Sequence, residues 1–304
     1  MNSPFKNSHC KNNHSNEQHN NFDNIYNGVY IPDRFRNVIL KHLILNYSKN
    51  INSFSPALLL AIQGAKGEGK SFMIKKICEY YSIEYIPISG AELCGNLEGD
   101  SVKKLISEYE SACIEAATNR KFYCIVIDDF HKSLAASNQD NINRTSNSET
   151  LIGRIMNLAD NPYIHKNRIP IILTGNNFTT IYAPLTRNSR MEIFDWVPNV
   201  EEKKKIVFNI FKQYYPQINF KVIEQLVNQY KDYYVAFFKS LAQEVFWGDC
   251  SSVIEEFHSQ RHNINLDSIT DLVIKNISVN KDISIENLLY IANERSKHVP
   301  KNYE

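Results

Sequence analysis

The feature that most constrains this chain is the run GAKGEGKS at residues 64–71, which fits the phosphate-loop pattern G-x-x-x-x-G-K-[ST] at every fixed position. Glycines let backbone N–H groups curl around an oxyanion, because no Cβ blocks the turn. Lys70 is expected to reach the β- and γ-phosphates of a nucleotide, and the Ser71 hydroxyl is expected to ligate Mg²⁺. The predicted nucleotide-binding residues are Gly64, Ala65, Lys66, Gly67, Glu68, Gly69, Lys70 and Ser71.

The sequence on either side of this loop supports the motif. Residues 57–62, ALLLAI, form a short apolar run that is typical of a buried parallel strand. After the loop, apolar residues at 72, 74, 77 and 78 recur at helical spacing, so the start of a helix is expected to point at the phosphates. A chance match in a surface turn is the competing interpretation. A strand before the loop and a helix after it argue against that interpretation.

Bulk composition excludes several classes of protein. Among 304 residues, 34 Lys and Arg balance 33 Asp and Glu, so there is no electrostatic case for a nucleic-acid partner. No apolar run approaches the roughly 20 residues that span a bilayer, so no membrane association is expected. The six cysteines are scattered without C-x-x-C pairs, and we interpret them as reduced thiols of a cytoplasmic protein.

The pattern along the chain predicts an α/β unit followed by a helical one. Residues 1–21, rich in Asn, Ser, His and Lys, are expected to form a disordered tail. Between 22 and 198, alternating elements predict a parallel sheet covered on both faces. Its strands are expected at 57–62, 85–88, 122–127 and 169–174, its helices at 34–47, 101–117 and 151–158, and a polar loop at 133–148. From 199 to 304, helices are expected at 201–211, 220–230, 235–246 and 285–294.

Polar residues follow two of these strands at the ends where ligands bind in open α/β sheets. Asp128 and Asp129 end the strand that begins at residue 122, and we assign Asp128 to Mg²⁺ and Asp129 to polarising the attacking water. Asn176 follows the strand that begins at residue 169 and is a candidate to hydrogen-bond the γ-phosphate or that water. Each is a common turn residue as well, and the order phosphate loop, acid, Asn along the chain favours the catalytic interpretation.

Arg187 and Arg190 lie three residues apart. On one helix face, residues at this spacing sit side by side. An arginine supplied by a neighbouring subunit can stabilise the charge on a transferring phosphoryl group. From the spacing alone, a solvated or structural pair is the preferred interpretation.

Four segments resemble the AAA+ ATPases of the Rubisco activase family, green type. They are the phosphate loop with its following Phe, NLADNP at 157–162, IPIILTGNNF at 169–178 and IYAPLTRNSRMEIFDW at 181–196. A generic AAA+ protein is expected to share the phosphate loop and Asn176. It is not expected to share Y-A-P-L followed by R-x-x-R-M-E, so the last segment is the most specific. The likeness runs from about residue 26 to residue 211.

The resemblance implies an AAA+ parallel-sheet domain at 22–198 and a smaller helical lid domain at 199–304, in a ring that is usually hexameric, with ATP at the subunit interfaces. It carries Arg187 and Arg190 over as arginine fingers that reach the neighbour's nucleotide, and it makes Asn176 the first sensor. It places residues 92–100 at a pore-facing loop and the stretch after residue 131 at a second one.

Family members use ATP hydrolysis to remodel Rubisco that is blocked by tight-binding sugar phosphates, and so release the inhibitor. The resemblance therefore implies Rubisco as the protein client. The implied location is the cytosol of a cyanobacterium or its carboxysome, rather than a chloroplast stroma.

The chain departs from the family in three places. Asp128-Asp129 stands where the family has an Asn-Asp pair. Phe237-Phe238 is followed by Lys239 instead of second-sensor arginines, and a lysine is a point charge rather than a planar fork. Residues 248–265, near where the family recognises its client, match poorly.

Three functions therefore stay open. The leading one is an ATP-hydrolysing chaperone that remodels Rubisco. The second keeps the motor and changes the client, because the segment at 248–265 diverges. The third is a nucleotide-gated scaffold or adaptor with weak ATPase activity, which the missing second-sensor arginine suggests.

Overall fold

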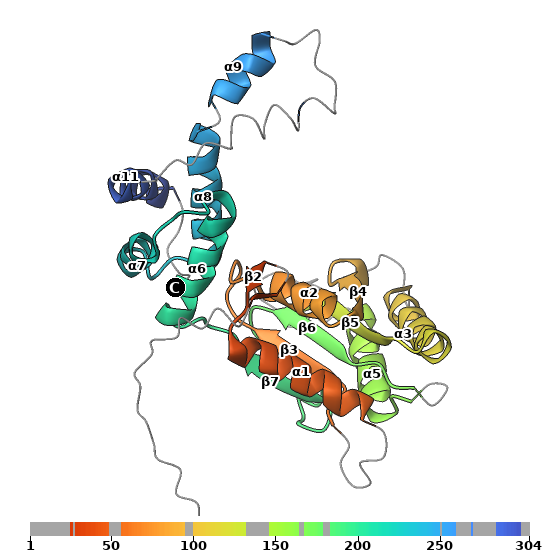
Figure 1. Cartoon of the computed structure of the whole chain (residues 1–304). Coiled ribbons are helices and arrows are strands. Elements are labelled where there is room, and N and C mark those ends of the chain that lie inside the picture. The colour runs from red at the N-terminus through yellow and green to blue at the C-terminus, as the bar shows by residue number, and fades with distance from the viewer. Residues whose placement is uncertain are drawn as a thin grey trace, which may run out of the picture.

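The computed structural model describes residues 25–26, 28–48, 56–94, 100–131, 146–163, 167–178, 183–249, 251–259, 269 and 284–298. The predicted tail lies outside the described residues. So do residues 95–99 and 132–145 of the two predicted pore loops. The described part contains a five-stranded sheet and a separate group of helices, as Figure 1 shows.

All five strands of this sheet run parallel. Their order is β4 (Ile83–Ser89), β5 (Phe122–Asp128), β6 (Ile171–Gly175), β3 (Leu59–Gln63) and β7 (Met191–Asp195). The central strands β3 and β6 are buried along almost their whole length, as expected where helices cover both faces. Because the strands are parallel, their carboxyl ends meet at one edge of the sheet, where ligands bind in folds of this kind.

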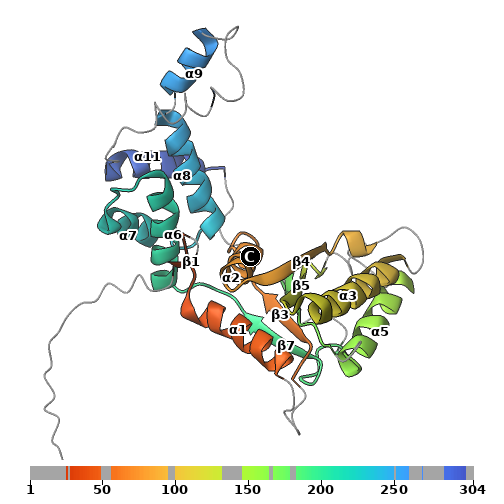
Figure 2. The ribbon, with the colours of Figure 1, turned by 45° about the vertical axis from the view of Figure 1, so that its right-hand side comes forward.

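Alternate residues of β3 pack on opposite faces of the sheet. Leu59 and Ala61 join a core with α3 (Asp100–Asn119) and α5 (Ser146–Asp160). Leu60 and Ile62 join a second core with α1 (Asp33–Tyr47) and α2 (Lys70–Tyr80). Figures 1 and 2 show these two pairs of helices on opposite sides of the sheet.

Four helices of the described part after β7, at residues 200–214, 220–229, 235–249 and 285–296, share a third core around Phe211, Leu241 and Leu288. Ile206 and Val235 of this helical part pack instead into the α1–α2 core, so the predicted domain division at residue 198 stays a prediction. Of the helices that the structure describes, none is long and apolar enough to cross a membrane. The remaining elements are α6 (Val200–Tyr214), α7 (Phe220–Gln229), α8 (Val235–Asp249), α9 (Ser251–Ser259), α11 (Ile285–Ser296), β1 (Ile25–Tyr26), β2 (Val29–Tyr30) and the 3₁₀ helix η1 (Glu92–Cys94).

The amino-terminal part of the described chain fastens α6 to the sheet. The Tyr30 N–H donates to Asn209 Oδ1 of α6 at 2.9 Å. Arg34 of α1 donates to both carboxylate oxygens of Glu202, at 2.7 and 2.8 Å. Its guanidinium also lies 4.6 Å from the centroid of the buried Trp196 ring. Glu202 therefore serves twice, because it also completes the capping box that begins α6.

The elements differ from the sequence prediction in ways that have physical reasons. β7 is absent from the prediction because its residues are half-buried and form no continuous apolar run. The strand predicted at 85–88 extends to seven residues in β4. Residues 146–148, predicted as loop, begin α5 with a polar turn that carries no apolar periodicity. Residues 183–190 form turns, so Arg187 and Arg190 share no helix face.

A buried polar cluster joins α1 to the amino-terminal edge of the sheet. His42 and Asn46 of α1 are buried, and Arg168 Nε donates to Asn46 Oδ1 at 2.6 Å. Arg168 also donates to the Pro56 carbonyl, ahead of β3. Burial lowers the pKa of His42 from 6.5 to about 3, and the charges of Arg168 and Lys41 act in the same direction. His42 is therefore neutral in the folded protein at neutral pH.

We expect His42 to make the fold sensitive to acid. The unfolded chain takes up a proton at this imidazole near pH 6.5, whereas the folded chain resists protonation down to about pH 3. The stability that neutral His42 contributes is therefore fully present above pH 6.5 and is lost as the pH falls towards 3, by up to about 5 kcal/mol. Urea unfolding of the wild type and of His42→Gln, from about pH 7 to about pH 4, measures this. Equal losses of unfolding free energy in both proteins would contradict it.

Candidate active site

The phosphate loop connects β3 to α2 at the carboxyl-terminal edge of the sheet. Gly67 and Gly69 have φ values of +89° and +76°, in the left-handed region that favours glycine. Gly69 is the N-cap of α2, so this helix begins at Lys70. The Lys70 ammonium donates to the carbonyls of Gly64 and Ala65 at 2.7 and 2.9 Å. The lysine charge is thus held inside the loop, where burial lowers its pKa.

Ser71 and Asp128 meet beside the loop. Ser71 Oγ donates to Asp128 Oδ1 at 2.5 Å. The Thr174 hydroxyl, near the end of β6, donates to the same oxygen. Hydroxyl and carboxylate oxygens are the hard ligands that Mg²⁺ prefers. In the part of the chain that the structure describes, no group of three or more His, Cys, Asp or Glu residues could hold a metal ion. The oxygens of Ser71 and Asp128 are donors of the kind that fits Mg²⁺.

Asp129 turns the chain directly after β5. Its φ of +53° is unusual for a residue with a side chain, and its N–H donates to Thr174 Oγ1 at 3.1 Å. β4 ends against the same turn, because the Gly90 N–H donates to the Asp128 carbonyl at 2.6 Å. A Cβ at Gly90 would overlap the Asp129 carbonyl oxygen, so glycine is required there. The carboxylates of Asp129 and Asp128 both act on Lys70, whose pKa they raise against the larger effect of burial.

Asn176 is exposed at the same edge of the sheet. It follows Gly175, whose carbonyl accepts a hydrogen bond from the Gly64 N–H at 3.2 Å. The next turn is fixed from β3, because the Phe178 N–H donates to Gln63 Oε1 at 2.7 Å. The structure thus brings Asn176 to the edge that also carries the loop and the two aspartates.

The helical part contacts the phosphate loop directly. The Ala236 N–H at the start of α8 donates to the Gly67 carbonyl at 2.9 Å. Trp196, which lies between β7 and the helical part, donates from Nε1–H to the Glu68 carbonyl at 2.9 Å. A Cβ added at Gly67 would lie 3.0 Å from Ala236 Cβ and 3.5 Å from Tyr234 Cβ. Gly67 is therefore needed both for its backbone conformation and for the close approach of α8.

Arg187 and Arg190 lie at the opposite edge of the sheet. The Arg190 carbonyl accepts the N–H of Leu59, the first residue of β3, so the length of β3, about 16 Å, separates this residue from the loop. Arg190 donates to both carboxylate oxygens of Asp160 at 2.7 Å and to the Pro184 carbonyl at 2.6 Å. The hydrogen bonds and charge of Arg190, with the charge of Arg187, lower the pKa of Asp160. Arg187 itself is exposed.

Two residues at these positions, Thr174 and Asp160, were not predicted as site residues, and the contacts of the predicted residue Glu68 were not predicted either. Thr174 ends an apolar run and resembles an ordinary β-branched strand residue in the sequence. Its hydroxyl at the end of a strand was the only indication that it could contact the site. Asp160 lies within NLADNP, yet nothing in that segment indicates which arginine it meets. Glu68 occupies a position of the motif that tolerates any residue, so its contacts had no sequence signal.

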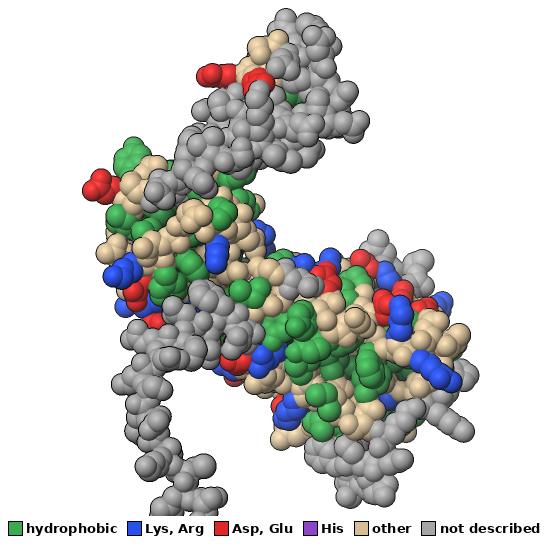
Figure 3. Space-filling view, viewed as in Figure 1, with side chains coloured by type: hydrophobic (Ala, Val, Ile, Leu, Met, Phe, Trp, Pro, Cys, Tyr) green, Lys and Arg blue, Asp and Glu red, His purple; other side chains and the backbone are tan. Residues whose placement is uncertain are grey.

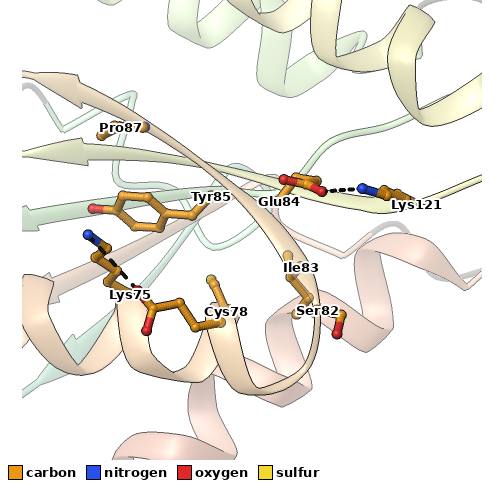
Figure 4. A pocket seen from close by; sticks show the side chains of 9 residues that line it. Lys75, Cys78, Ser82, Ile83, Glu84, Tyr85, Pro87 and Lys121 are labelled. Carbon is orange, nitrogen blue, oxygen red and sulfur yellow. Dashed lines mark hydrogen bonds and ion pairs between the residues drawn. The ribbon is translucent and has the colours of Figure 1, made fainter. Parts of the chain in front are cut away.

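Two of the grooves elsewhere on the described surface lie beside β4 and the start of β5. One, of about 720 Å³, lies between α2 and β4; Figure 4 shows Tyr85 in it near Lys75, and the Glu84–Lys121 ion pair lies farther along the groove. The other, of about 390 Å³, is apolar and lies between α1 and the start of β5. Figure 3 shows hydrophobic side chains gathered on the face that carries α1 and α2. Neither groove is lined by a predicted site residue, so the candidate site rests on the side-chain geometry at the loop.

Comparison with protein families gives the class of this domain. Residues 60–199 match the ATPase family associated with various cellular activities, AAA. The match covers the strands from β3 to β7, the phosphate loop and both aspartates. Over these residues, the parallel sheet and its loop are thus those of an AAA-type α/β phosphate-loop domain.

Curated relatives narrow the likeness. The chain is 33% identical over 227 residues to the ribulose bisphosphate carboxylase/oxygenase activase of Nostoc, a match that covers 71% of this chain and 54% of the relative. It is 32% identical over 236 residues to the chloroplastic activase of Zea mays (74% and 53%) and 31% identical over 245 residues to that of Arabidopsis thaliana (77% and 51%). The chain spans about half the length of the curated relatives that it matches.

We expect Gly67→Ala to destabilise the protein and Gly153→Ala to stabilise it. Alanine at 67 would be strained in its backbone and crowded against α8, at a cost of about 1–3 kcal/mol. Gly153 lies within α5 with open space around a built Cβ, so alanine there should add about 0.5–1 kcal/mol. Thermal and urea unfolding of both variants measure the difference. Equal stability of the two variants would contradict the proposed crowding at Gly67.

Proposed function

We propose that this chain binds ATP with Mg²⁺ at the phosphate loop and hydrolyses it to ADP and phosphate. The observation that carries the proposal is the contact of Ser71 with Asp128, at the end of a phosphate loop that already encloses the Lys70 ammonium. An exposed strand-end carboxylate would not need two hydroxyl partners, whereas Asp128 has both Ser71 and Thr174. These contacts preorganise the oxygen atoms that the bound ion would need.

Each site residue has a role in this mechanism. Lys70 and the loop N–H groups bind the β- and γ-phosphates. Ser71 and Asp128 would hold Mg²⁺, and the ion would neutralise charge on the phosphates. Asp129 orients the attacking water and accepts its proton at a carboxylate oxygen. Asn176 hydrogen-bonds the γ-phosphate or this water from the end of β6.

The arginines act from a neighbouring copy of the chain. About 16 Å of strand separates Arg190 from the loop of its own chain, so neither arginine completes this site from within. Arg187 is exposed and reaches the neighbour's nucleotide. Both arginines were predicted as arginine fingers. Arg190 is hydrogen-bonded to Asp160, so its role here is to fix the turn from which Arg187 projects. This proposal requires an oligomer, and a hexameric ring is the form we propose.

Mixing two inactive variants tests the shared site. Lys70→Ala and Arg187→Ala should each lower ATP turnover by at least about 100-fold, since one removes phosphate binding and the other the charge that stabilises the transition state. Mixed assemblies should recover up to about a quarter of wild-type turnover, because some intact loops then face a neighbour that still has Arg187. The control Arg154→Ala changes an exposed arginine on α5 and should leave turnover unchanged.

Recovery on mixing supports catalysis in trans. Absence of recovery in assemblies that co-purification on an affinity tag carried by one variant shows to be mixed would contradict it. Turnover by the wild type no faster than by Lys70→Ala would instead support the nucleotide-gated scaffold.

We further propose that ATP hydrolysis by this chain remodels Rubisco and releases bound sugar phosphates, in the cytosol of a cyanobacterium. The names of the similar proteins support this client, and the match of residues 60–199 to the AAA family supports ATP hydrolysis as the driving reaction. A different protein client is the second candidate. It is supported by residues 248–265, which match the family poorly near where the family recognises its client.

Reactivation of inhibited Rubisco tests the client. Green-type Rubisco blocked with a tight-binding sugar bisphosphate should regain carboxylase activity when the full chain and ATP are added. It should not do so with ATP and the Lys70→Ala variant, whose loop lacks the phosphate-binding lysine. ATP turnover without reactivation would retain the ATPase and overturn Rubisco as the client.

A further inference from the structure

Glu68 is a carboxylate inside the phosphate loop that points away from solvent. It is only 5% exposed, although its position in the motif imposes no residue type. One carboxylate oxygen lies 3.9 Å from the Lys203 ammonium of α6, and the other accepts the Val235 N–H at 3.4 Å. Burial raises the pKa of Glu68, and Lys203, the Val235 N–H and Lys70 oppose this effect. Glu68 therefore depends on two lysines, one in the helical part and one in the nucleotide site.

The same contacts cap helix α8. The first N–H groups of a helix have no partner within it and need acceptors from elsewhere. Here Val235 and Ala236, the first two residues of α8, donate to the Glu68 carboxylate and the Gly67 carbonyl. The helix macrodipole also favours a negative charge at this end. The phosphate loop thus serves as the N-terminal cap of a helix from the other part of the protein.

Lys203 holds the opposite side of this junction. It is 6% exposed, and its ammonium donates to the carbonyls of Lys231 and Tyr233, in the connection between α7 and α8, at 2.9 and 2.8 Å. Burial lowers its pKa, and Glu68 is the largest charge that opposes this effect. A buried charge that loses its partner is strongly destabilising, so Glu68 and Lys203 depend on each other.

We propose that Glu68 and Lys203 form a charge latch. In this latch, a nucleotide bound at the phosphate loop changes how strongly the loop binds the N-terminus of α8. The proposal rests on nucleotide binding at the loop. Bound phosphates would attract the ammonium of Lys70, which is one of the two lysines that balance the charge of Glu68. They would also add negative charge near Glu68. The hold of Glu68 on Val235 and Lys203 must then change, so the position of the helical part follows the nucleotide.

Two charge-removing variants give opposite signs if the latch exists. Glu68→Gln removes a negative charge near the phosphates and keeps an acceptor for Val235, so ADP·Mg²⁺ should bind about three- to tenfold tighter. Lys203→Met leaves Glu68 without its partner, so ADP·Mg²⁺ should bind weaker by a similar factor. The double variant should return to within about twofold of wild type. Isothermal titration of the full chain with ADP and Mg²⁺ measures all four proteins.

The neighbouring residue supplies a matched control. Lys204, also on α6 and 6% exposed, pairs with Glu201 and Glu224 at 2.8 and 2.9 Å, and none of these pairs involves the loop. Lys204→Met should therefore leave ADP affinity unchanged. Weaker binding in Glu68→Gln and Lys203→Met alike, or no change in either, would overturn the latch. If Lys203→Met fails to fold, Glu68→Gln and the double variant still decide the sign.

A second measurement reads the helix itself. Hydrogen exchange of the Val235 and Ala236 amides should change at least about threefold when wild-type protein binds ADP·Mg²⁺, and should not change in the double variant. Unchanged exchange in wild type that binds ADP would overturn the latch and leave the proposed function intact. A wild-type chain that binds no ADP at all would overturn both.

Discussion

The backbone of the phosphate loop is packed from two directions, and the rest of the arrangement depends on this. On one side Gly64 approaches Trp196 so closely that a Cβ would overlap the Trp196 carbonyl oxygen. On the other side Gly67 lies against the start of α8. Protein donors bind four of the loop carbonyls. Lys70 donates to those of Gly64 and Ala65, the Ala236 N–H donates to that of Gly67, and Trp196 donates to that of Glu68. The loop N–H groups are then the atoms that the motif offers to phosphate.

Parallel strands give the site its two halves. Asp128, Asp129 and Asn176 lie at or directly after strand ends at the carboxyl edge of the sheet. The turn that carries Arg187 and Arg190 lies at the amino edge, because it directly precedes β7. A strand inside a packed sheet cannot shorten, so no motion of one chain's sheet brings Arg187 to its own loop. This separation supports the proposed shared site, and the support does not depend on the identity of the protein client. The Arg190–Asp160 pair adds to it, because it fixes the turn without using Arg187.

Physical pattern decides which parts of this structure could be predicted from sequence. Buried strands such as β3 and β5 were predictable because both faces demand apolar residues, and the loop was predictable because its glycines answer a steric need. β7 escaped because an edge strand with one open face carries a mixed pattern. The role of Thr174 and the contacts of Glu68 were not predictable, because they depend on partners in other strands and helices, which the periodicity of one segment does not reveal.

These contacts bear on the absence of a second-sensor arginine after Phe237-Phe238. Lys239 of α8 lies 5.8 Å from the ring of Phe72, in the first turn of α2. The firmer links between α8 and the nucleotide site are the two backbone N–H groups that the loop caps. A side chain that reached the nucleotide would sense it directly, whereas a cap senses only the position and charge of the loop. The helical part is therefore coupled to the loop through backbone geometry and one buried ion pair, and such a pair holds only while both charges stay in place.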